Sequence, residues 1–226
     1  MKKRMFLCLL VLCLIVSLAA CGGRSEPAAE HGDNDPKPAE QSGDSAGDQG
    51  GNAPAEVTED DFSIVDLGDG TCKISACEAT ARKLVVPDTI RGLKVVGIGD
   101  YAFNQCPAEE IVLPDSVEFI ETNAFCLCEN MRKVDLGSGL KRIGQLAFLS
   151  CNALERVDFP DGMTTLESFV FGACEKLGEV YIPASVTEIP MGIANITQCP
   201  NIVIVTPAGS VAEQAAKDNG LPVRNP

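Results

Sequence analysis

Cysteine is the residue of this sequence with the greatest capacity for chemistry, and its spacing is regular. The chain has eleven cysteines and a single histidine, His31, in 226 residues. Five of the cysteines recur every 22 to 25 residues: Cys106, Cys128, Cys151, Cys174 and Cys199. Thiols in register on chain segments about 4.8 Å apart are within reach of disulfide geometry, but an odd number cannot pair completely. Because a free cysteine also packs as a small apolar side chain, we expect these five to belong to the hydrophobic core.

Of the six cysteines outside this series, three lie in the part of the chain that we expect to fold. Cys126 is adjacent to Phe125 and is expected to be exposed. Cys72 and Cys77 would lie roughly 16 Å apart in one extended strand, which is too far for a disulfide. Metal binding by Cys126 and Cys128 has only weak support. We therefore predict no metal and no cofactor.

Enzymatic chemistry has little support in this sequence. His31 precedes the part of the chain that we expect to fold, so a Ser-His-Asp or Cys-His arrangement and a histidine zinc site are excluded there. Two carboxylates suffice for glycoside hydrolysis, but no acidic pair stands out from the solvated background. Residues 97–102 read G-x-G-x-x-A, as in a dinucleotide loop, yet no long helix follows them. We predict that the protein is not an enzyme.

A pattern of 23 residues repeats through the second half of the chain. This repeat must position the regularly spaced cysteines. Four segments follow one another without a gap from Leu113, and a fifth precedes them, stretched by an insertion at residues 91–94. The predicted repeats are 86–112, 113–135, 136–158, 159–181 and 182–204. Self-similarity at this period predicts a solenoid of about five coils, in which each repeat buries its apolar positions against its neighbours.

The repeat predicts which residues point inward. Each copy has a strand-like triplet with its first and third residues inward and its middle residue outward, as in Ile111, Val112 and Leu113. Further inward columns are expected at isoleucine, phenylalanine and aliphatic positions: Ile98, Ile120, Ile143, Leu166 and Ile189; Phe103, Phe125, Phe148, Phe171 and Ile196; Met131, Leu154, Leu177 and Ile202. Like residues of successive coils should therefore stack on one another.

Both ends of the repeat array have signals for caps. Residues 62–67 and 71–74 alternate apolar and polar side chains around Asp69 and Gly70, which predicts a β-hairpin. Ser210 and Glu213 have the spacing of a capping box, and Gly220 ends the helix that they would begin. We predict one folded domain, 62–226, with a hairpin cap and a short C-terminal helix.

The N-terminal residues have the features of an export signal. Three basic residues precede an apolar run of 16 residues, Met5 to Ala20, which is shorter than the roughly 20 residues of a transmembrane helix. Leu18-Ala19-Ala20-Cys21 resembles a bacterial lipobox, in which the cysteine becomes the acylated N-terminus; the alternative is an ordinary signal peptide with a coincidental cysteine. We predict a signal peptide at 1–20 and lipidation of Cys21. Acyl chains on Cys21 would anchor the protein to a membrane.

Charge and composition divide the rest of the chain. Residues 22–61 carry eleven acidic and two basic side chains and few apolar ones, so we expect a disordered acidic linker in 21–61. The remainder from Phe62 has a net charge of −8. Neither part has the clustered Lys and Arg of a nucleic-acid-binding protein, and no nucleic-acid partner is expected.

The repeats resemble the BspA-type leucine-rich repeats of bacterial surface proteins. The approximate consensus of that family is I-P-x-S-V-T-x-I-G-x-x-A-F-x-x-C-x-x-L-x-x-V-x, and this chain keeps the Ala-Phe pair at Ala102, Ala124 and Ala147. The fifth copy departs from it at Pro190 and Ile196. The resemblance implies a right-handed leucine-rich-repeat coil of short β-strands with 3-10 or irregular turns. It also implies a role in protein–protein interaction or adhesion at the bacterial surface.

The predicted binding surface is the outward side of the strand triplets, because repeat proteins bind on extended surfaces. Its candidate residues are Arg132, Lys133, Asp135, Glu155, Arg156, Asp158, Glu179 and Tyr181, beside Glu109, Glu110 and Val112. Tyr181 is a candidate anchor, since aromatic residues dominate interface energetics. The expected partner is an extracellular or envelope protein, such as a host matrix protein. Three alternatives stay open: the charged face only keeps the sheet soluble, the protein is an envelope spacer, or it binds glycans.

Overall fold

The structure is a computed structural model that describes residues 56–189 and 199–226. These residues belong to one compact unit, Pro54–Pro226. The predicted signal peptide, the lipidation site Cys21 and the column position Ile196 lie outside the described residues. The folded unit begins before Phe62, because a short 3-10 helix, η1 (Glu59–Asp61), occupies the end of the predicted linker.

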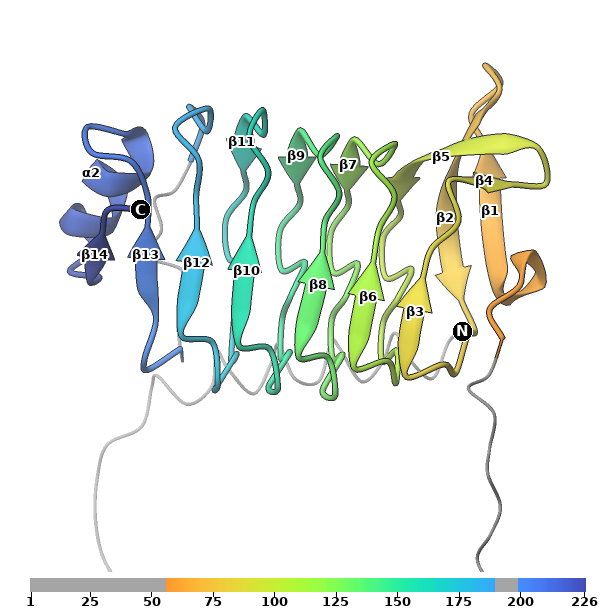
Figure 1. Cartoon of the computed structure of the whole chain (residues 1–226), viewed down its shortest axis with the longest axis horizontal. Coiled ribbons are helices and arrows are strands. Elements are labelled where there is room, and N and C mark those ends of the chain that lie inside the picture. Colours follow the sequence, from red (N-terminus) through yellow and green to blue (C-terminus); the bar gives the residue numbers. More distant parts are fainter. Residues whose placement is uncertain (1–55, 190–198) are drawn as a thin grey trace, which may run out of the picture. The chain divides into compact units, whose positions relative to one another are not determined.

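The unit is a solenoid whose coils follow one another along a single axis (Figure 1). The central repeats each contribute a strand of three residues and then a strand of two, and turns connect them. Strands of the same type pair in parallel between successive coils, which produces two sheets on different sides of the coil. The predicted repeat solenoid is confirmed.

The sheet of three-residue strands is called the triplet sheet below. Its order is β14-β13-β12-β10-β8-β6-β3. Its strands are β3 (Lys83–Val85), β6 (Glu110–Val112), β8 (Lys133–Asp135), β10 (Arg156–Asp158), β12 (Glu179–Tyr181), β13 (Val203–Val205) and β14 (Val223–Arg224). The side chains alternate as predicted: Ile111 and Leu113 are buried, and Val112 between them is half-buried on the outer side.

The second sheet is called the doublet sheet, after the two-residue strands that form most of it. Its order is β1-β2-β5-β7-β9-β11, and β4 also pairs with β5. Its strands are β1 (Phe62–Asp66), β2 (Thr71–Cys77), β4 (Thr89–Ile90), β5 (Leu93–Ile98), β7 (Phe119–Ile120), β9 (Arg142–Ile143) and β11 (Thr165–Leu166). Beyond β11 the described residues add an isolated bridge, Thr165–Glu188.

The core between the sheets consists of stacked side chains of one type, as the repeat predicts. The ring centroids of Phe103, Phe125, Phe148 and Phe171 follow one another at 5.1, 5.3 and 5.6 Å. The last two steps are nearly parallel stacks, with interplanar angles of 13° and 9°. All four rings are buried, and Phe62 of the hairpin lies 6.4 Å from Phe103. The N-terminal cap therefore extends the phenylalanine column by one ring.

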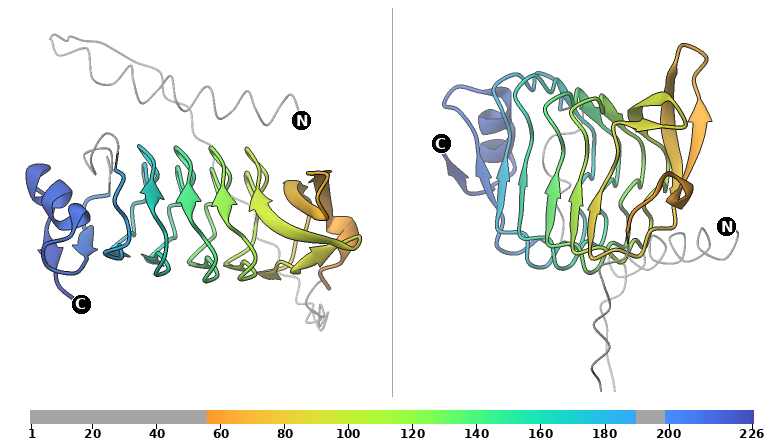
Figure 2. Two further views of the ribbon diagram at one scale, coloured as in Figure 1. Left: turned by 90° about the horizontal axis from the view of Figure 1, so that it is seen from above. Right: turned by 45° about the vertical axis from the view of Figure 1, so that its right-hand side comes forward.

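Both predicted caps are present at the ends of the unit (Figure 2). β1 and β2 form an antiparallel hairpin, and the Asp69 carboxylate accepts a hydrogen bond from the Thr71 amide in its turn. Helix α2 (Val211–Asp218) begins at Ser210, whose hydroxyl accepts a hydrogen bond from the Glu213 amide. The side chain of Glu213 accepts from the Gly209 amide.

Two sequence predictions need correction. The repeat count of five omitted a coil, because β3 lies in the segment read as part of the cap and pairs with β6 as the other triplet strands pair. The prediction that Cys126 is exposed was wrong: its side chain is buried, in a turn rather than a strand. The insertion at 91–94, whose conformation the sequence did not predict, forms a tight turn with Arg91 and Gly92 at positive φ. Strands β4 and β5 pair across this turn.

Candidate functional site

The residues predicted to bind a partner lie in rows on the outer face of the triplet sheet. Strand register places Lys133, Arg156 and Glu179 side by side in one row. Asp158 and Tyr181 are neighbours in a second row, with Asp135 at the same position of its own strand. The Lys133, Asp135, Arg156 and Asp158 side chains are exposed, whereas Glu179 and Tyr181 are half-buried. The other two candidates, Arg132 and Glu155, are exposed and directly precede β8 and β10.

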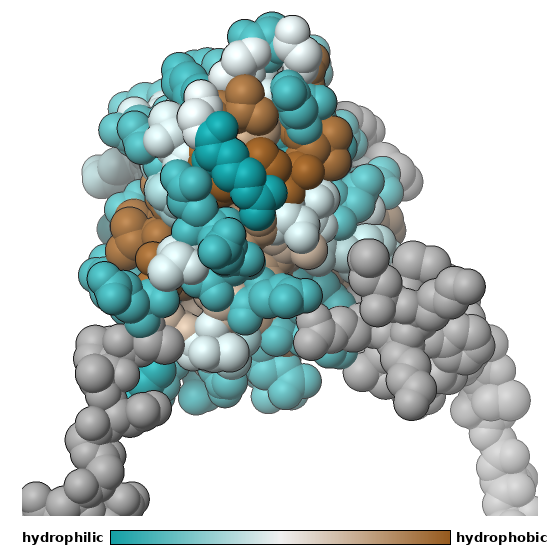
Figure 3. Space-filling model, turned by 90° about the vertical axis from the view of Figure 1, so that its right-hand side faces the viewer, coloured by the Kyte–Doolittle hydropathy of each residue, from teal (hydrophilic) through white to brown (hydrophobic). Residues whose placement is uncertain are grey.

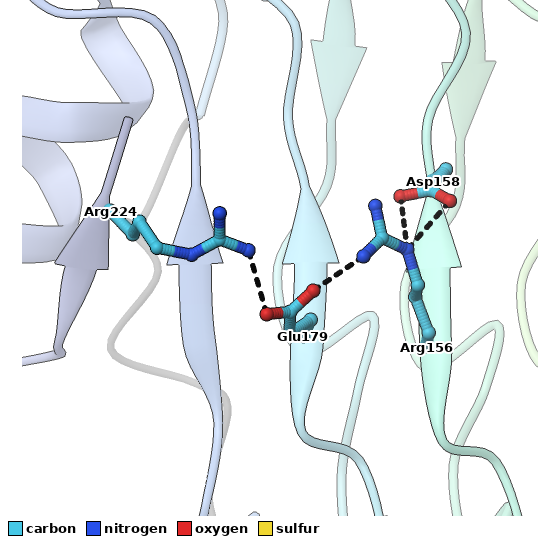
Figure 4. A network of polar contacts seen from close by, with 4 residues as sticks. All are labelled: Arg156, Asp158, Glu179 and Arg224. Carbon is cyan, nitrogen blue, oxygen red and sulfur yellow. Dashed lines mark hydrogen bonds and ion pairs between the residues drawn. The ribbon is translucent and has the colours of Figure 1, made fainter. Parts of the chain in front are cut away.

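Glu179 lies at the centre of a charged network in the C-terminal half of this face (Figure 4). One of its carboxylate oxygens pairs with Arg156, and the other lies 2.7 Å from Nη2 of Arg224 in β14. Arg156 also holds both carboxylate oxygens of Asp158 through Nε, at 2.8 and 2.9 Å. The hydrogen bond to Asp158 raises the pKa of Arg156 further, so its charge is fixed.

A second network occupies the N-terminal half of the face. The Glu110 carboxylate lies 3.2 Å from Lys83 Nζ and 3.6 Å from Lys133 Nζ. The hydrogen bond from Lys83 lowers the pKa of Glu110. Exposed ion pairs of this kind contribute little to stability because solvent screens them, so these networks determine the charge of the surface more than they stabilise the fold.

The two networks meet at the step between β8 and β10, where like charges face each other. Lys133 and Arg156 are in register across this step. Asp135 and Asp158 occupy the same position, the last residue, of these two strands. The pairing of β8 with β10 covers one residue pair, whereas β6–β8 and β10–β12 each cover three. Like charges on neighbouring strands repel. We call this step, with these four side chains, the seam.

Tyr181 borders the seam on its C-terminal side. Its side chain is half-buried, and burial followed by the negative charge of Asp161 raises the pKa of its hydroxyl. The phenol is therefore a neutral hydrogen-bonding group at ordinary pH. An aromatic ring with a polar tip, already partly held in place, has the properties of an interface anchor.

Sequence reasoning missed two features of the surface. Arg224 joins the Glu179 network from beyond the last repeat, where the repeat pattern gives no register. Phe119 is a half-exposed aromatic residue of the doublet sheet, and its ring lies against Gly97, where an added Cβ would come within 2.2 Å of it. The Arg142 guanidinium lies 4.9 Å from the ring centroid. The sequence does contain a signal for the position of this ring. Gly97 stands where the next repeats have larger side chains, and the missing side chain leaves room for the ring.

The N-terminal end of the unit has apolar patches between hydrophilic side chains (Figure 3). Exposed apolar residues of the cap are Val65, Leu67 and Val85. β1 and β3 are the outermost strands of the two sheets at this end. In the described residues, the apolar side chains of Val65, Leu67 and Val85 are left exposed.

The described residues provide little for metal or membrane chemistry. Within 56–189 and 199–226, no group of three or more His, Cys, Asp or Glu is placed to hold a metal ion. In the same residues, no helix combines the length and the apolar character of a bilayer-spanning segment.

Comparison with known proteins agrees with this architecture. A solved leucine-rich repeat protein from Bacteroides ovatus is 25% identical, with a TM-score of 0.57, over 67% of this chain and 41% of its own. The T. pallidum leucine-rich repeat protein is 21% identical, with a TM-score of 0.49, over 75% of this chain and 98% of its own. No curated protein matches the sequence significantly. The profile of the BspA-type leucine-rich repeat region matches residues 95–215 in six copies, more than half of the chain. The chain belongs to the BspA-type leucine-rich repeat family.

Proposed function

We propose that this protein is a lipid-anchored bacterial surface protein that binds another protein through the outer face of its triplet sheet. Cys21 carries the acyl chains, and the acidic linker separates the repeat unit from the membrane. The partner is an extracellular or envelope protein, with host matrix proteins as the first class to test. Binding to it gives the protein a role in adhesion.

The seam is the observation that carries this proposal. Lys133 and Arg156 lie in register with no carboxylate of their own row between them, and the side chain of Lys133 is 68% exposed. A partner carboxylate placed between the two cations would form charge-assisted hydrogen bonds with both. Tyr181 beside them offers apolar area for the same partner. The proposal therefore specifies a partner with an exposed acidic side chain next to an apolar one.

Binding is tested by capture from host extracellular-matrix and bacterial-envelope extracts with the full chain, followed by titration of the captured protein. Arg156→Glu and Tyr181→Ala should each weaken binding about tenfold or more, as loss of a hot-spot residue does. Lys141→Glu is the matched charge reversal, since Lys141 is exposed beside β9 in the doublet sheet and should leave affinity unchanged. Equal binding by all variants would place the site elsewhere, and capture of no partner from either extract would favour a spacer role.

Anchoring is tested separately by growing the expressing bacterium with labelled fatty acid. We expect the label to appear in the wild-type protein and in Cys13→Ala, and to be lost from Cys21→Ala. The Cys21→Ala protein should also leave the membrane fraction, because without Cys21 it carries none of the acyl chains that attach it stably. Membrane retention of an unlabelled Cys21→Ala protein would contradict lipid anchoring without affecting the binding proposal.

A further inference from the structure

The N-terminal cap places a sixth thiol beside the first member of the cysteine column, which the repeat pattern does not reveal. Cys77, the last residue of β2, belongs to the hairpin cap, and its amide donates to the carbonyl of Ala102 in the first coil at 2.8 Å. Cys77 pairs with Phe62, whose ring continues the phenylalanine column at Phe103. The amides of Phe103 and Phe125 donate to Ala124 and Ala147 in the same way, so the backbone of Cys77 takes the phenylalanine position of the coil before Cys106. Six thiols, unlike five, can be divided into pairs.

The thiol at the cap differs from those inside the array. The Sγ atoms of Cys128, Cys151 and Cys174 are fully buried and donate to the carbonyl groups of the preceding coil at 3.0 to 3.2 Å. Those carbonyl groups belong to the phenylalanine position of the preceding coil, and the residue at that position before Cys106 is Cys77. The neighbouring group of Cys106 on that side is therefore the Cys77 thiol. Cys77 is half-buried, so it is the member of this pair that a reagent in solution reaches.

The contact between the two thiols shifts their pKa values in opposite directions. A hydrogen bond from Cys77 stabilises the Cys106 thiolate and lowers the pKa of Cys106 to about 7. The same contact, together with burial, raises the pKa of Cys77. A thiolate is the nucleophile in disulfide exchange, so the pair holds a reactive thiolate next to a thiol that solvent reaches.

We propose that Cys77 and Cys106 form a disulfide that fastens the N-terminal cap to the first coil. The oxidant is a disulfide of the extracytoplasmic space, either a small molecule or a thiol–disulfide oxidoreductase. Cys77, which solvent reaches, first loses its proton to solvent, and its thiolate attacks the oxidant disulfide, forming a mixed disulfide and releasing one oxidant thiol. The Cys106 thiolate then attacks the Cys77 sulfur, which releases the second oxidant thiol. Two cysteine thiols lose two electrons and two protons, and the oxidant disulfide is reduced to two thiols.

Oxidation in the cell rests on export, which is part of the proposed function, but the test on purified protein does not. The full chain is reduced, then incubated with oxidised glutathione, alkylated and digested, and cross-linked peptides are identified by mass. We expect one dominant species that joins the peptides of Cys77 and Cys106 and has lost the mass of two hydrogens. We also expect oxidation to raise the melting temperature by roughly 5–10 °C, because a cross-link constrains the unfolded chain.

Variants separate this effect from general thiol chemistry. Cys77→Ala should fold, because Cys77 is half-buried, and should lose both the cross-link and the redox-dependent melting shift. Cys72→Ala, in the same strand, should keep both. The inference is overturned if glutathione remains on Cys77 as a stable mixed disulfide, if Cys77 joins another cysteine, or if Cys77→Ala keeps the redox-dependent shift.

Discussion

Individual residues of this solenoid adopt a backbone conformation that their residue types do not predict. Two positions in each turn region have positive φ without being glycine: Tyr101, Asn123, Leu146 and Phe169, and Gln105, Leu127, Ser150 and Ala173. Several of their amides donate to the next coil, as Leu127 does to the Leu149 carbonyl at 2.8 Å. A left-handed residue with a Cβ costs roughly 1–2 kcal/mol. The coil-to-coil hydrogen bonds hold these residues in place despite that cost.

Ala173→Gly tests this reading because it removes only a methyl group. Relief of the left-handed strain should exceed the added entropy of the unfolded chain, and the free energy of unfolding should rise by about 0–1 kcal/mol. Chemical denaturation monitored by circular dichroism measures the change.

The matched control is Ala147→Gly, at a buried position outside the positive-φ series. Here the lost methyl burial and the flexibility of glycine act in the same direction, and about 1–2 kcal/mol of stability should be lost. The same loss at Ala173 would show that the left-handed backbone there carries no strain.

At the scale of the strands, the like charges of the seam, which we propose serve binding, reduce the stability of the fold. β8 and β10 pair over one residue pair, with Lys133 facing Arg156. Asp135 also accepts a hydrogen bond from the Gly137 amide at 3.2 Å, so it shapes the end of its own strand. A face optimised only for stability would alternate its charges across this step, as it does between Lys83 and Glu110.

Asp135→Asn removes one charge of the seam and keeps an acceptor for the Gly137 amide. The free energy of unfolding should rise by about 0.2–1 kcal/mol, the usual range for a cross-strand pair. Because the effect is electrostatic, the gain should shrink as salt is raised. Unfolding curves at low and high ionic strength measure it, and a gain that does not depend on salt would contradict the repulsion.

The sequence predicted the elements that repeat and failed where the chain departs from the repeat. The strand triplets, the inward columns and the alternation around Val112 follow from side-chain period alone. The positions of β3 and Cys77 do not, because the cap reaches the same columns with different spacing. Arg224 was missed for a similar reason, since its neighbour Glu179 is 45 residues away in the chain. The burial of Cys126 depends on a turn conformation that its residue type does not encode.

At the scale of the whole molecule, several acidic groups are stabilised by contacts that exist only when the chain is folded. Hydrogen bonds from Ser138 lower the pKa of Asp115, and Lys217 with the Gly209 amide lowers that of Glu213. The contact of Asp115 with the Ser138 amide, at 2.7 Å, joins successive coils. These carboxylates therefore stabilise the fold while they are ionised.

A carboxyl whose pKa is depressed in the folded state contributes stability above its unfolded pKa and loses it as pH falls through the folded value. The melting temperature should accordingly decrease as pH is lowered from about 5 to about 3, around and below the ordinary carboxyl range. Thermal unfolding across this range measures the decrease, and Asp115→Asn should make it shallower. A melting temperature that stays constant or rises on acidification would contradict these pKa directions.

The coil-to-coil arrangement also determines how the molecule should respond to force. Each triplet strand from β6 to β13 bonds only to the strands of the adjacent coils, and among residues 56–189 and 199–226 no strand ties the two ends together. Tension applied between the caps would therefore load the coils in series. They should detach one after another, at similar forces, so that a pulling force would extend the protein stepwise before it failed.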